Sequence, residues 1–222
     1  MEATEIPVGV VGLGLMGCSI ATCLLMSGHP VVAIAPIPVD METAEFRIRK
    51  HLNKAKEEGL VTETVEFYLE NLTISEAYST LKLCQLVIEC TIENEEIKRS
   101  VYGKIEAEIS DDALLTSNTS AIPISELQKL TQKPDRFFGL HWAEPSHTTR
   151  FLEIICGDQS DITKGEYLYE LSHGWGKEPT LVRKDIRGFI ANRLMYAMYR
   201  EAFYLVENGY ATVEDVDQIG RA

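Results

Sequence analysis

The sequence has few basic residues, and it lacks a long apolar run; each shortage excludes a class of protein. Its 222 residues carry 21 lysine and arginine side chains against 34 aspartate and glutamate side chains, a formal net charge of −13. A surface of that charge repels nucleic acid and anionic membranes, so neither is expected as a partner. No apolar stretch reaches the length of a membrane span, and residues 1–5 lack the basic start of a signal peptide. The expected location is therefore the cytoplasm.

Clustered cysteines are also missing. None of the five cysteines stands in a C-x-x-C pair, and their neighbours are mostly apolar. Zinc sites and disulfide frameworks need recurring cysteine spacings, so we expect buried, reduced thiols and no metal ion. These residues are Cys18, Cys23, Cys84, Cys90 and Cys156.

Short β-type runs alternate with longer helical patterns along most of the chain. This alternation is typical of a doubly wound, mostly parallel α/β sheet. Strands are expected at 6–11, 31–35, 86–89, 114–116, 137–140 and 152–156, and helices at 16–27, 41–58, 94–109 and 163–173. Apolar residues then recur at helical spacing over 189–208, and another helix is expected at 213–219. The pattern predicts an α/β domain over residues 1–186 and the beginning of an all-helical domain over 187–222.

A glycine-rich turn follows the first strand. Residues 8–17 read VGVVGLGLMG, a buried strand that runs into G-x-G-x-x-G and then into a helix. The first glycine permits the tight turn, the second lets a pyrophosphate approach the backbone, and the third lets the helix pack on the strand. Free N–H groups at the helix N-terminus favour the negative charge of that pyrophosphate. The motif predicts a Rossmann-type dinucleotide site formed by Gly12, Leu13, Gly14, Leu15, Met16 and Gly17.

The second strand lacks an acidic residue at its end. NAD enzymes of this fold usually have Asp or Glu there, which binds the adenosine ribose. Here the strand ends in Ala35 and Pro36, and the nearest acid, Asp40, lies five residues beyond Ala35. No arginine or lysine follows directly to receive the 2′-phosphate of NADP. NAD is the expected cofactor, and NADP stays open.

Three further segments have a characteristic order and spacing. The first is LVIECTIENEEIK at 86–98. The second joins SNTS at 117–120 to FFGLH at 137–141 and FLEII at 151–155, and the third joins GKEP at 176–179 to GFIANRL at 188–194. Together they resemble the 3-hydroxyacyl-CoA dehydrogenase family across nearly the whole chain.

The resemblance implies NAD-linked, reversible oxidation of an L-3-hydroxyacyl-CoA to the 3-ketoacyl-CoA, a step of fatty acid metabolism. In that family a helical C-terminal domain completes the substrate cleft and dimerises. That domain normally continues well past a segment such as 214–217, so we expect this chain to be a truncated form that is inactive alone, and a homodimer when full length.

The resemblance assigns His141 as the catalytic base and Glu153 as its partner. The chemistry supports that pair, because histidine can accept and return a hydroxyl proton near neutral pH, and a carboxylate fixes its tautomer. Ser120 and Asn192 match the family's polar contacts to the reacting oxygen and cofactor. The simpler alternatives are a structural histidine, a turn serine and an exposed amide. Further cofactor contacts are expected from Asn118, Glu93 and Lys98, unless the two charged residues only face solvent.

The segment after the histidine departs from the family. The family usually has Asn-Pro after its aromatic residues, whereas this chain has Glu144 before Pro145. A carboxylate there disfavours a nearby anionic group and could take part in proton transfer. Arg150 could bind a substrate carboxylate or phosphate, or could be a surface charge. These two residues keep open a dehydrogenase of a free 3-hydroxy acid or sugar acid.

A basic helix face bears on the use of CoA. Arg47, Lys50 and Lys54 share one face of the helix expected at 41–58, where the family places CoA contacts. They could bind the CoA phosphates or form a solvated face. The last alternative is a non-catalytic dinucleotide-binding relative, against which the retained Ser120, His141, Glu153 and Asn192 speak.

Overall fold

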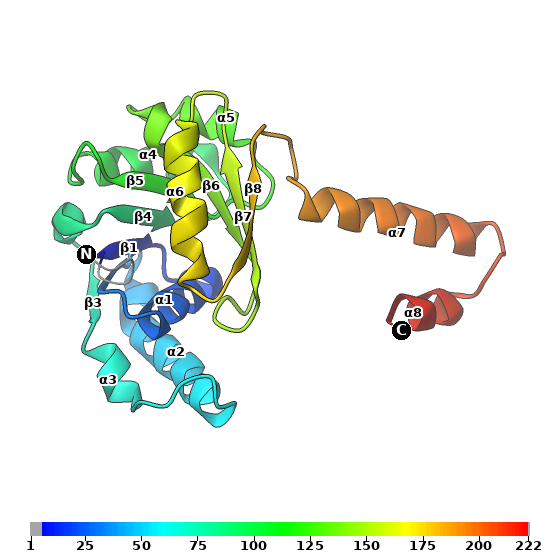
Figure 1. The fold of residues 1–222 in the computed structure, drawn as a ribbon, viewed down its shortest axis with the longest axis horizontal. Helices are drawn as coiled ribbons and strands as arrows, with labels where there is room; N and C mark the ends of the chain where they lie inside the picture. The colour runs from blue at the N-terminus through cyan, green and yellow to red at the C-terminus, as the bar shows by residue number, and fades with distance from the viewer. Residues whose placement is uncertain (1–5, 222) are drawn as a thin grey trace.

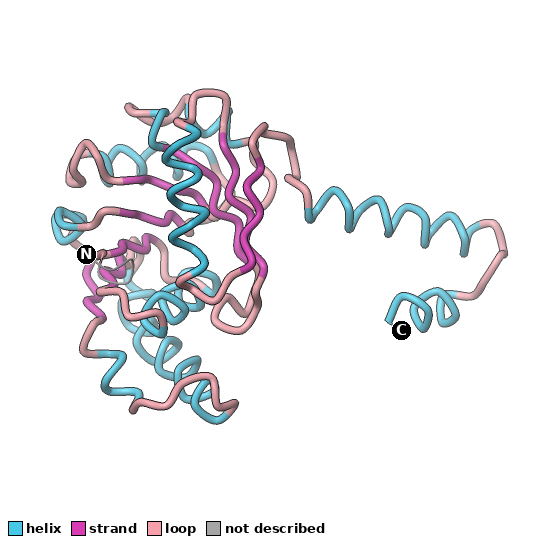
Figure 2. Tube along the Cα trace, in the orientation of Figure 1, coloured by secondary structure: helices cyan, strands magenta, loops and turns pink. Residues whose placement is uncertain are grey.

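An eight-stranded sheet forms the body of the molecule, in a computed structural model that describes residues 6–221 (Figures 1 and 2). The ends of the two expected domains, residues 1–5 and residue 222, lie outside the described part. The strands are β1 (Val8–Val11), β2 (Val31–Ile34), β3 (Leu72–Ser75), β4 (Leu86–Glu89), β5 (Leu114–Ser117), β6 (Phe137–Trp142), β7 (Phe151–Cys156) and β8 (Glu178–Val182).

Helices lie between most of these strands, and two more follow β8. They are α1 (Leu15–Met26), α2 (Pro38–Glu57), α3 (Val65–Leu69), α4 (Glu95–Glu106), α5 (Ile124–Gln128), α6 (Ile162–His173), α7 (Ala191–Glu207) and α8 (Val213–Arg221). Two short 3₁₀ segments, η1 (Tyr78–Leu83) and η2 (Pro134–Arg136), complete the connections. Within residues 6–221 we find no helix with both the length and the apolar character needed to cross a bilayer.

The strand order is β3-β2-β1-β4-β5-β6-β7-β8. Strands β3 to β6 are parallel, β7 is antiparallel to β6, and β8 is parallel to β7. From β1 the chain adds β2 and then β3 on one side. It then crosses to the other side of β1, where β4 to β8 follow in order. Ligands of open α/β sheets bind at such a switch point, beyond the carboxyl ends of the strands.

Apolar residues pack on both faces of the sheet. On one face Ile20 and Leu24 of α1, Ile48 of α2 and Leu168 of α6 belong to one buried cluster. On the other face Val101 and Ile105 of α4 and Leu127 of α5 belong to a second cluster. Coverage of both faces explains why the central strands are continuous apolar runs. The predicted doubly wound, mostly parallel sheet is confirmed.

The strands that sequence patterns did not predict are the two edges of the sheet. β3 (LTIS) and β8 (EPTLV) are only partly buried, and β8 contains Pro179. Edge strands bury one side at most and tolerate proline, so they lack a strong apolar pattern. The helix expected from residue 41 begins earlier, at Pro38, since proline suits the first turn of a helix.

The two last helices stand away from the sheet. α7 projects from the end of β8, and α8 follows it at the far end (Figure 1). None of the described residues of α7 is buried, and large apolar side chains on it are exposed. These include Leu194, Tyr196, Met198 and Phe203.

Candidate active site

The glycine turn between β1 and α1 has space for a dinucleotide. Gly12 has φ +97°, and a Cβ on Gly17 would lie 1.8 Å from the Gly12 carbonyl oxygen, so neither position accepts a side chain. Around a Cβ on Gly14, in contrast, no atom of the described residues lies within 4 Å. In that same part of the chain no side chain caps α1 and no acidic residue occupies its first turn. This end of α1 therefore offers free N–H groups and open space, which fit a pyrophosphate.

Asp40 reaches back to this turn from the first turn of α2. Its Oδ2 accepts a hydrogen bond from the Leu13 N–H at 3.3 Å. Arg47 donates to the Leu13 carbonyl oxygen at 2.8 Å and lies 3.5 Å from Asp40. The five-residue distance between Ala35 and Asp40 in the sequence gives no indication of this contact. The early start of α2 at Pro38 is what returns its carboxylate to the turn.

His141 and Glu153 are directly opposite each other on β6 and β7. The His141 Nδ1 and the Glu153 Oε2 are 2.8 Å apart, and both side chains are buried. The antiparallel pairing of β6 with β7 explains how residues twelve positions apart form this contact. The expected dyad is therefore assembled.

The second oxygen of Glu153 binds the beginning of α7. Its Oε1 accepts hydrogen bonds from the N–H groups of Ile190 at 2.8 Å and Ala191 at 2.9 Å. Burial raises the pKa of the Glu153 carboxyl, but the bonds from His141, Ala191 and Ile190 outweigh burial and hold the pKa below its usual value. The carboxylate is ionised at neutral pH and can only accept, so the His141 Nδ1 donates to it. The Nε2 of a neutral His141 is then a proton acceptor.

Two aromatic rings enclose the histidine. The ring centres of Phe151 and Phe189 each lie 5.5 Å from that of His141. Only 8% of His141 is exposed. These rings limit the access of water to the imidazole.

Ser120 and Asn192 are brought together across the loop after β5 and the first turn of α7. The Asn192 amide donates to the Ser120 carbonyl oxygen at 2.8 Å. Both residues line a hollow of about 630 Å³, and Asn192 follows directly on Ala191, whose N–H binds Glu153. The hollow is lined by Ser120, Ala121, Arg187, Gly188, Asn192, Arg193, Tyr196 and Arg200.

An ionic cluster, buried at Glu89 and Lys98 and exposed at Glu93, supports the loop that carries Ser120. Glu93 accepts hydrogen bonds from the Thr119 hydroxyl at 2.6 Å and the Ser120 N–H at 2.9 Å. Lys98 lies between Glu93, at 3.4 Å, and Glu89, at 2.9 Å. Only 1% of Lys98 is exposed, so it is not a solvent-facing charge.

Glu89 is the centre of this cluster, and sequence reasoning missed its role. Besides Lys98, its carboxylate accepts hydrogen bonds from Tyr102 at 3.0 Å and Ser117 at 2.7 Å, and from Thr91. The available signal was an acidic residue that directly follows the three apolar residues of a buried strand. The neighbouring Asn118 also has a partner within the protein, since its side-chain oxygen accepts from the Trp142 N–H at 3.1 Å.

The two departures from the family pattern lie in different surroundings. Arg150 is exposed and pairs with Glu178 at 3.0 Å, as the surface-charge alternative expects. Glu144 is exposed as well, but it lines a hollow of about 640 Å³ beside the glycine turn. That hollow is formed by Gly14, Leu15, Asp40, Arg47, Lys50, His51, Lys54, Glu144, Pro145 and His147. The basic face of α2 thus lies next to the dinucleotide turn.

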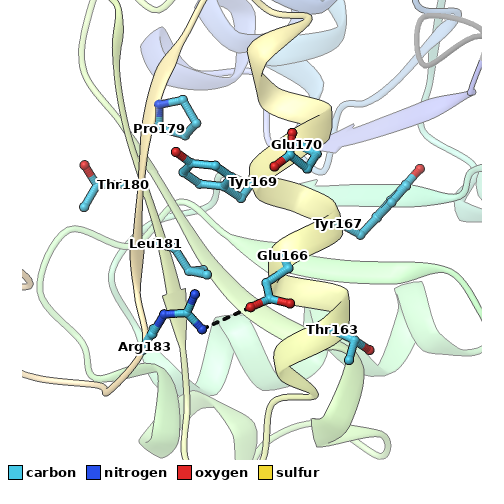
Figure 3. A pocket seen from close by; sticks show the side chains of 9 residues that line it. All are labelled: Thr163, Glu166, Tyr167, Tyr169, Glu170, Pro179, Thr180, Leu181 and Arg183. Atoms are coloured by element: carbon cyan, nitrogen blue, oxygen red, sulfur yellow. Dashed lines mark hydrogen bonds and ion pairs between the residues drawn. The ribbon is translucent and has the colours of Figure 1, made fainter.

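A further hollow is lined by a different set of residues. It measures about 890 Å³ and opens between α6 and β8, where Glu166 and Arg183 form an ion pair at 3.1 Å (Figure 3). None of the expected catalytic or cofactor residues lines it. Within residues 6–221 no group of three potential metal ligands comes together either.

Comparison with known proteins gives matches over both parts of the chain. Residues 7–186 match the family model described as "3-hydroxyacyl-CoA dehydrogenase, NAD binding domain". Residues 188–222 match "3-hydroxyacyl-CoA dehydrogenase, C-terminal domain".

Individual relatives act on different substrates. The chain is 34% identical over 212 residues to a 5-formyl-3-hydroxy-2-methylpyridine 4-carboxylate 5-dehydrogenase of Mesorhizobium japonicum, covering 95% of this chain and 68% of the relative. It is 32% identical over 218 residues to a 3-hydroxybutyryl-CoA dehydrogenase of Bradyrhizobium diazoefficiens, covering 98% and 74%. The crystal structure of (S)-3-hydroxybutyryl-CoA dehydrogenase PaaH1 from Ralstonia eutropha superposes with a TM-score of 0.88 at 30% identity, over 94% of this chain and 74% of that one.

Proposed function

This chain belongs to the 3-hydroxyacyl-CoA dehydrogenase family and is an NAD-dependent dehydrogenase, and we propose that it reversibly oxidises an L-3-hydroxyacyl-CoA to the 3-ketoacyl-CoA. The observation that carries the proposal is the buried His141–Glu153 pair, with Nδ1 and Oε2 2.8 Å apart. Its geometry supplies a proton acceptor of fixed tautomer, which the oxidation of a secondary alcohol needs.

The reaction separates a proton from a hydride. NAD, when bound, supplies the nicotinamide carbon that accepts the hydride. The His141 Nε2 takes the hydroxyl proton and returns it in the reverse reaction. Glu153 keeps the imidazole oriented and stabilises its charged form, because its Oε1 is held by two backbone N–H groups.

Ser120 and Asn192 would position the reacting oxygen. A hydroxyl and an amide can each donate a hydrogen bond to the oxygen on which charge develops. The Asn192 amide uses one N–H on the Ser120 carbonyl oxygen, which leaves the other N–H for a substrate. Glu93 and Lys98 would act one step further back, through the loop that Glu93 binds.

The basic face of α2 supports CoA as the acyl carrier. Lys50 and Lys54 line the hollow beside Gly14 and are free to meet phosphate groups, apart from a long 3.7 Å contact between Lys54 and Glu58. Arg47 is engaged with Asp40 and the Leu13 carbonyl oxygen, so it contributes less than the two lysines.

A free acid is the second candidate substrate, and one observation favours it. A relative of this chain is named for a pyridine carboxylate and not for a CoA ester. Arg150 gives this candidate little support, because its guanidinium already pairs with Glu178.

The test is NADH formation and consumption with matched substrates, on the 222-residue chain and on a version lengthened at its C-terminus to match its relatives. Acetoacetyl-CoA and free 3-keto acids are compared in the wild type, His141→Ala and His173→Ala. His173 is exposed on α6, so its replacement is the control. We expect turnover of the CoA ester, a loss on the order of 10²- to 10⁴-fold in His141→Ala, and no change in the control. Activity with free acids alone would favour the second candidate, and full activity of His141→Ala would refute the assigned base.

The assembly is part of the same proposal. The boundary between the dinucleotide-binding and helical domains is placed at residues 186 and 187, and the helical part is assigned to dimerisation. The exposed apolar side chains of α7 support this assignment. Light scattering of the longer version should give the mass of a homodimer. Growth on fatty acids after gene deletion would test the metabolic role, and cell fractionation the cytoplasmic location.

A further inference from the structure

The end of β2 carries no group that could bind a ribose. The strand ends at Ile34 and is followed by Ala35, which is buried, and Pro36, which has no side-chain donor or acceptor. In this fold the adenosine ribose lies between the pyrophosphate at the N-terminus of α1 and the end of β2. An NAD-dependent chain therefore needs another acceptor for the ribose hydroxyls.

We propose that Asp40, from the first turn of α2, is that acceptor and that its carboxylate makes the chain prefer NAD over NADP. Its Oδ2 lies 3.3 Å from the nitrogen of Leu13, in the middle of the glycine turn. Asp40 also lines the same hollow as Gly14, where the pyrophosphate fits. The carboxylate thus lies within the span of one ribose from the pyrophosphate position, although it comes from a different element than usual.

Charge explains the selectivity. Asp40 is only 7% exposed, so a 2′-phosphate placed against it would bring like charges together where water screens them poorly. A 2′-hydroxyl, in contrast, donates a hydrogen bond to a carboxylate. Asp40 is a specificity-determining residue in this interpretation.

Arg47 is the residue that could reverse this selectivity. Arginine near this position accommodates the 2′-phosphate in NADP enzymes. Here, however, the guanidinium donates to the Leu13 carbonyl oxygen at 2.8 Å and lies 3.5 Å from Asp40. These contacts hold the Asp40 carboxylate in place and engage the Arg47 guanidinium.

The inference concerns cofactor binding and is independent of the substrate that is oxidised. It is tested by titrating NADH and NADPH into the same protein preparation and following nicotinamide fluorescence, without any turnover. The variants are Asp40→Asn, Arg47→Met and the control Glu42→Gln. Glu42 is an exposed acid on the same helix that forms no ion pair among residues 6–221.

We expect the wild type to bind NADH more tightly than NADPH. In Asp40→Asn, NADH binding should weaken by about 10-fold, because a charge-assisted hydrogen bond becomes a neutral one, while NADPH binding improves or stays the same. Glu42→Gln should keep the wild-type ratio of the two dissociation constants. Because the ratio comes from one preparation, partial misfolding does not change it.

Two results would overturn the inference. The first is an unchanged ratio in Asp40→Asn. The second is a wild type that prefers NADPH and loses that preference in Arg47→Met, which would make Arg47 the residue that reads the 2′-phosphate. We expect Arg47→Met to weaken the binding of NADPH no more than the binding of NADH.

Discussion

The Glu153 carboxylate receives hydrogen bonds on both oxygens, from an imidazole on one side and from two backbone N–H groups on the other. Such a group is held in one orientation and in its ionised form. It therefore fixes which nitrogen of His141 carries the proton, a detail that no sequence pattern can give.

Replacing Glu153 by glutamine should separate this electrostatic role from packing. The side chain keeps its shape, but the charge is lost, and one of its contacts must meet an amide N–H. We expect kcat to fall on the order of 10⁴-fold, as when the carboxylate that orients a catalytic histidine becomes an amide. The dissociation constant of NADH should stay within about twofold. Equal losses in both quantities would show that the substitution disturbs the fold instead.

A second residue-scale prediction concerns the buried ion pair between Lys98 and Glu89. Removing one partner leaves an uncompensated charge in the core. Lys98→Met should lower the free energy of unfolding by about 3–5 kcal/mol, measured with urea. Arg99→Met is the control, since Arg99 is exposed on the same helix. The double variant Glu89→Gln with Lys98→Met should recover part of the loss, because the amide removes the charge while its oxygen still accepts from Tyr102 or Ser117; a double variant no more stable than Lys98→Met would contradict the explanation.

At the scale of elements, the sequence predicted most of the central sheet and the dinucleotide turn. Buried parallel strands are continuous apolar runs, and the glycine turn has a fixed spacing, so both leave a clear local signal. The edge strands β3 and β8 leave a weak signal, because each is only partly buried. The Asp40 contact left no signal in the sequence, because it depends on where α2 begins and not on the spacing from β2.

The glycine turn gives an element-scale prediction. Gly14 has φ −68° and ψ −160°, which alanine also adopts, and a Cβ there would meet no described atom within 4 Å. Gly14→Ala should therefore change the free energy of unfolding by no more than about 1 kcal/mol. It should weaken the binding of NADH by about 10-fold or more, because the added methyl group would overpack against the pyrophosphate. Gly103→Ala, in the middle of α4, should stabilise the protein by about 0.5–1 kcal/mol and leave NADH binding unchanged. Unchanged NADH affinity in Gly14→Ala would place the pyrophosphate elsewhere.

At the scale of the whole molecule, two buried histidines join distant segments. The His29 Nδ1 donates to the Ile6 carbonyl oxygen at 3.0 Å, and its Nε2 accepts from the Trp175 indole at 2.8 Å. The His147 Nδ1 lies 3.4 Å from the Ser19 hydroxyl and so links the β6–β7 loop to α1. The His29–Trp175 and His147–Ser19 contacts each join residues more than a hundred positions apart in the sequence, so they form only in the complete fold.

Stability should fall as the pH drops through the histidine range. Burial lowers the pKa of His29, and burial together with the charge of His51 lowers the pKa of His147 to about 4. Below about pH 6.5 these histidines are protonated in the unfolded chain but stay neutral in the folded chain. Each therefore lowers the free energy of unfolding by up to about 1.4 kcal/mol per pH unit. For His147 the loss ends near pH 4, where the folded state also takes the proton.

Urea unfolding between pH 7.5 and pH 4.5 measures this effect. In His147→Gln the slope of stability against pH should be shallower than in the wild type, and in His173→Gln it should be unchanged. A slope that His147→Gln leaves intact would assign the pH dependence to other groups.

The bonds from Ile190 and Ala191 tie the start of α7 to the Glu153 carboxylate. Moving α7 away from the sheet would lengthen these two hydrogen bonds, which help to hold the Glu153 carboxylate in its ionised form. The orientation of the carboxylate that holds His141 therefore depends on where α7 begins relative to the sheet.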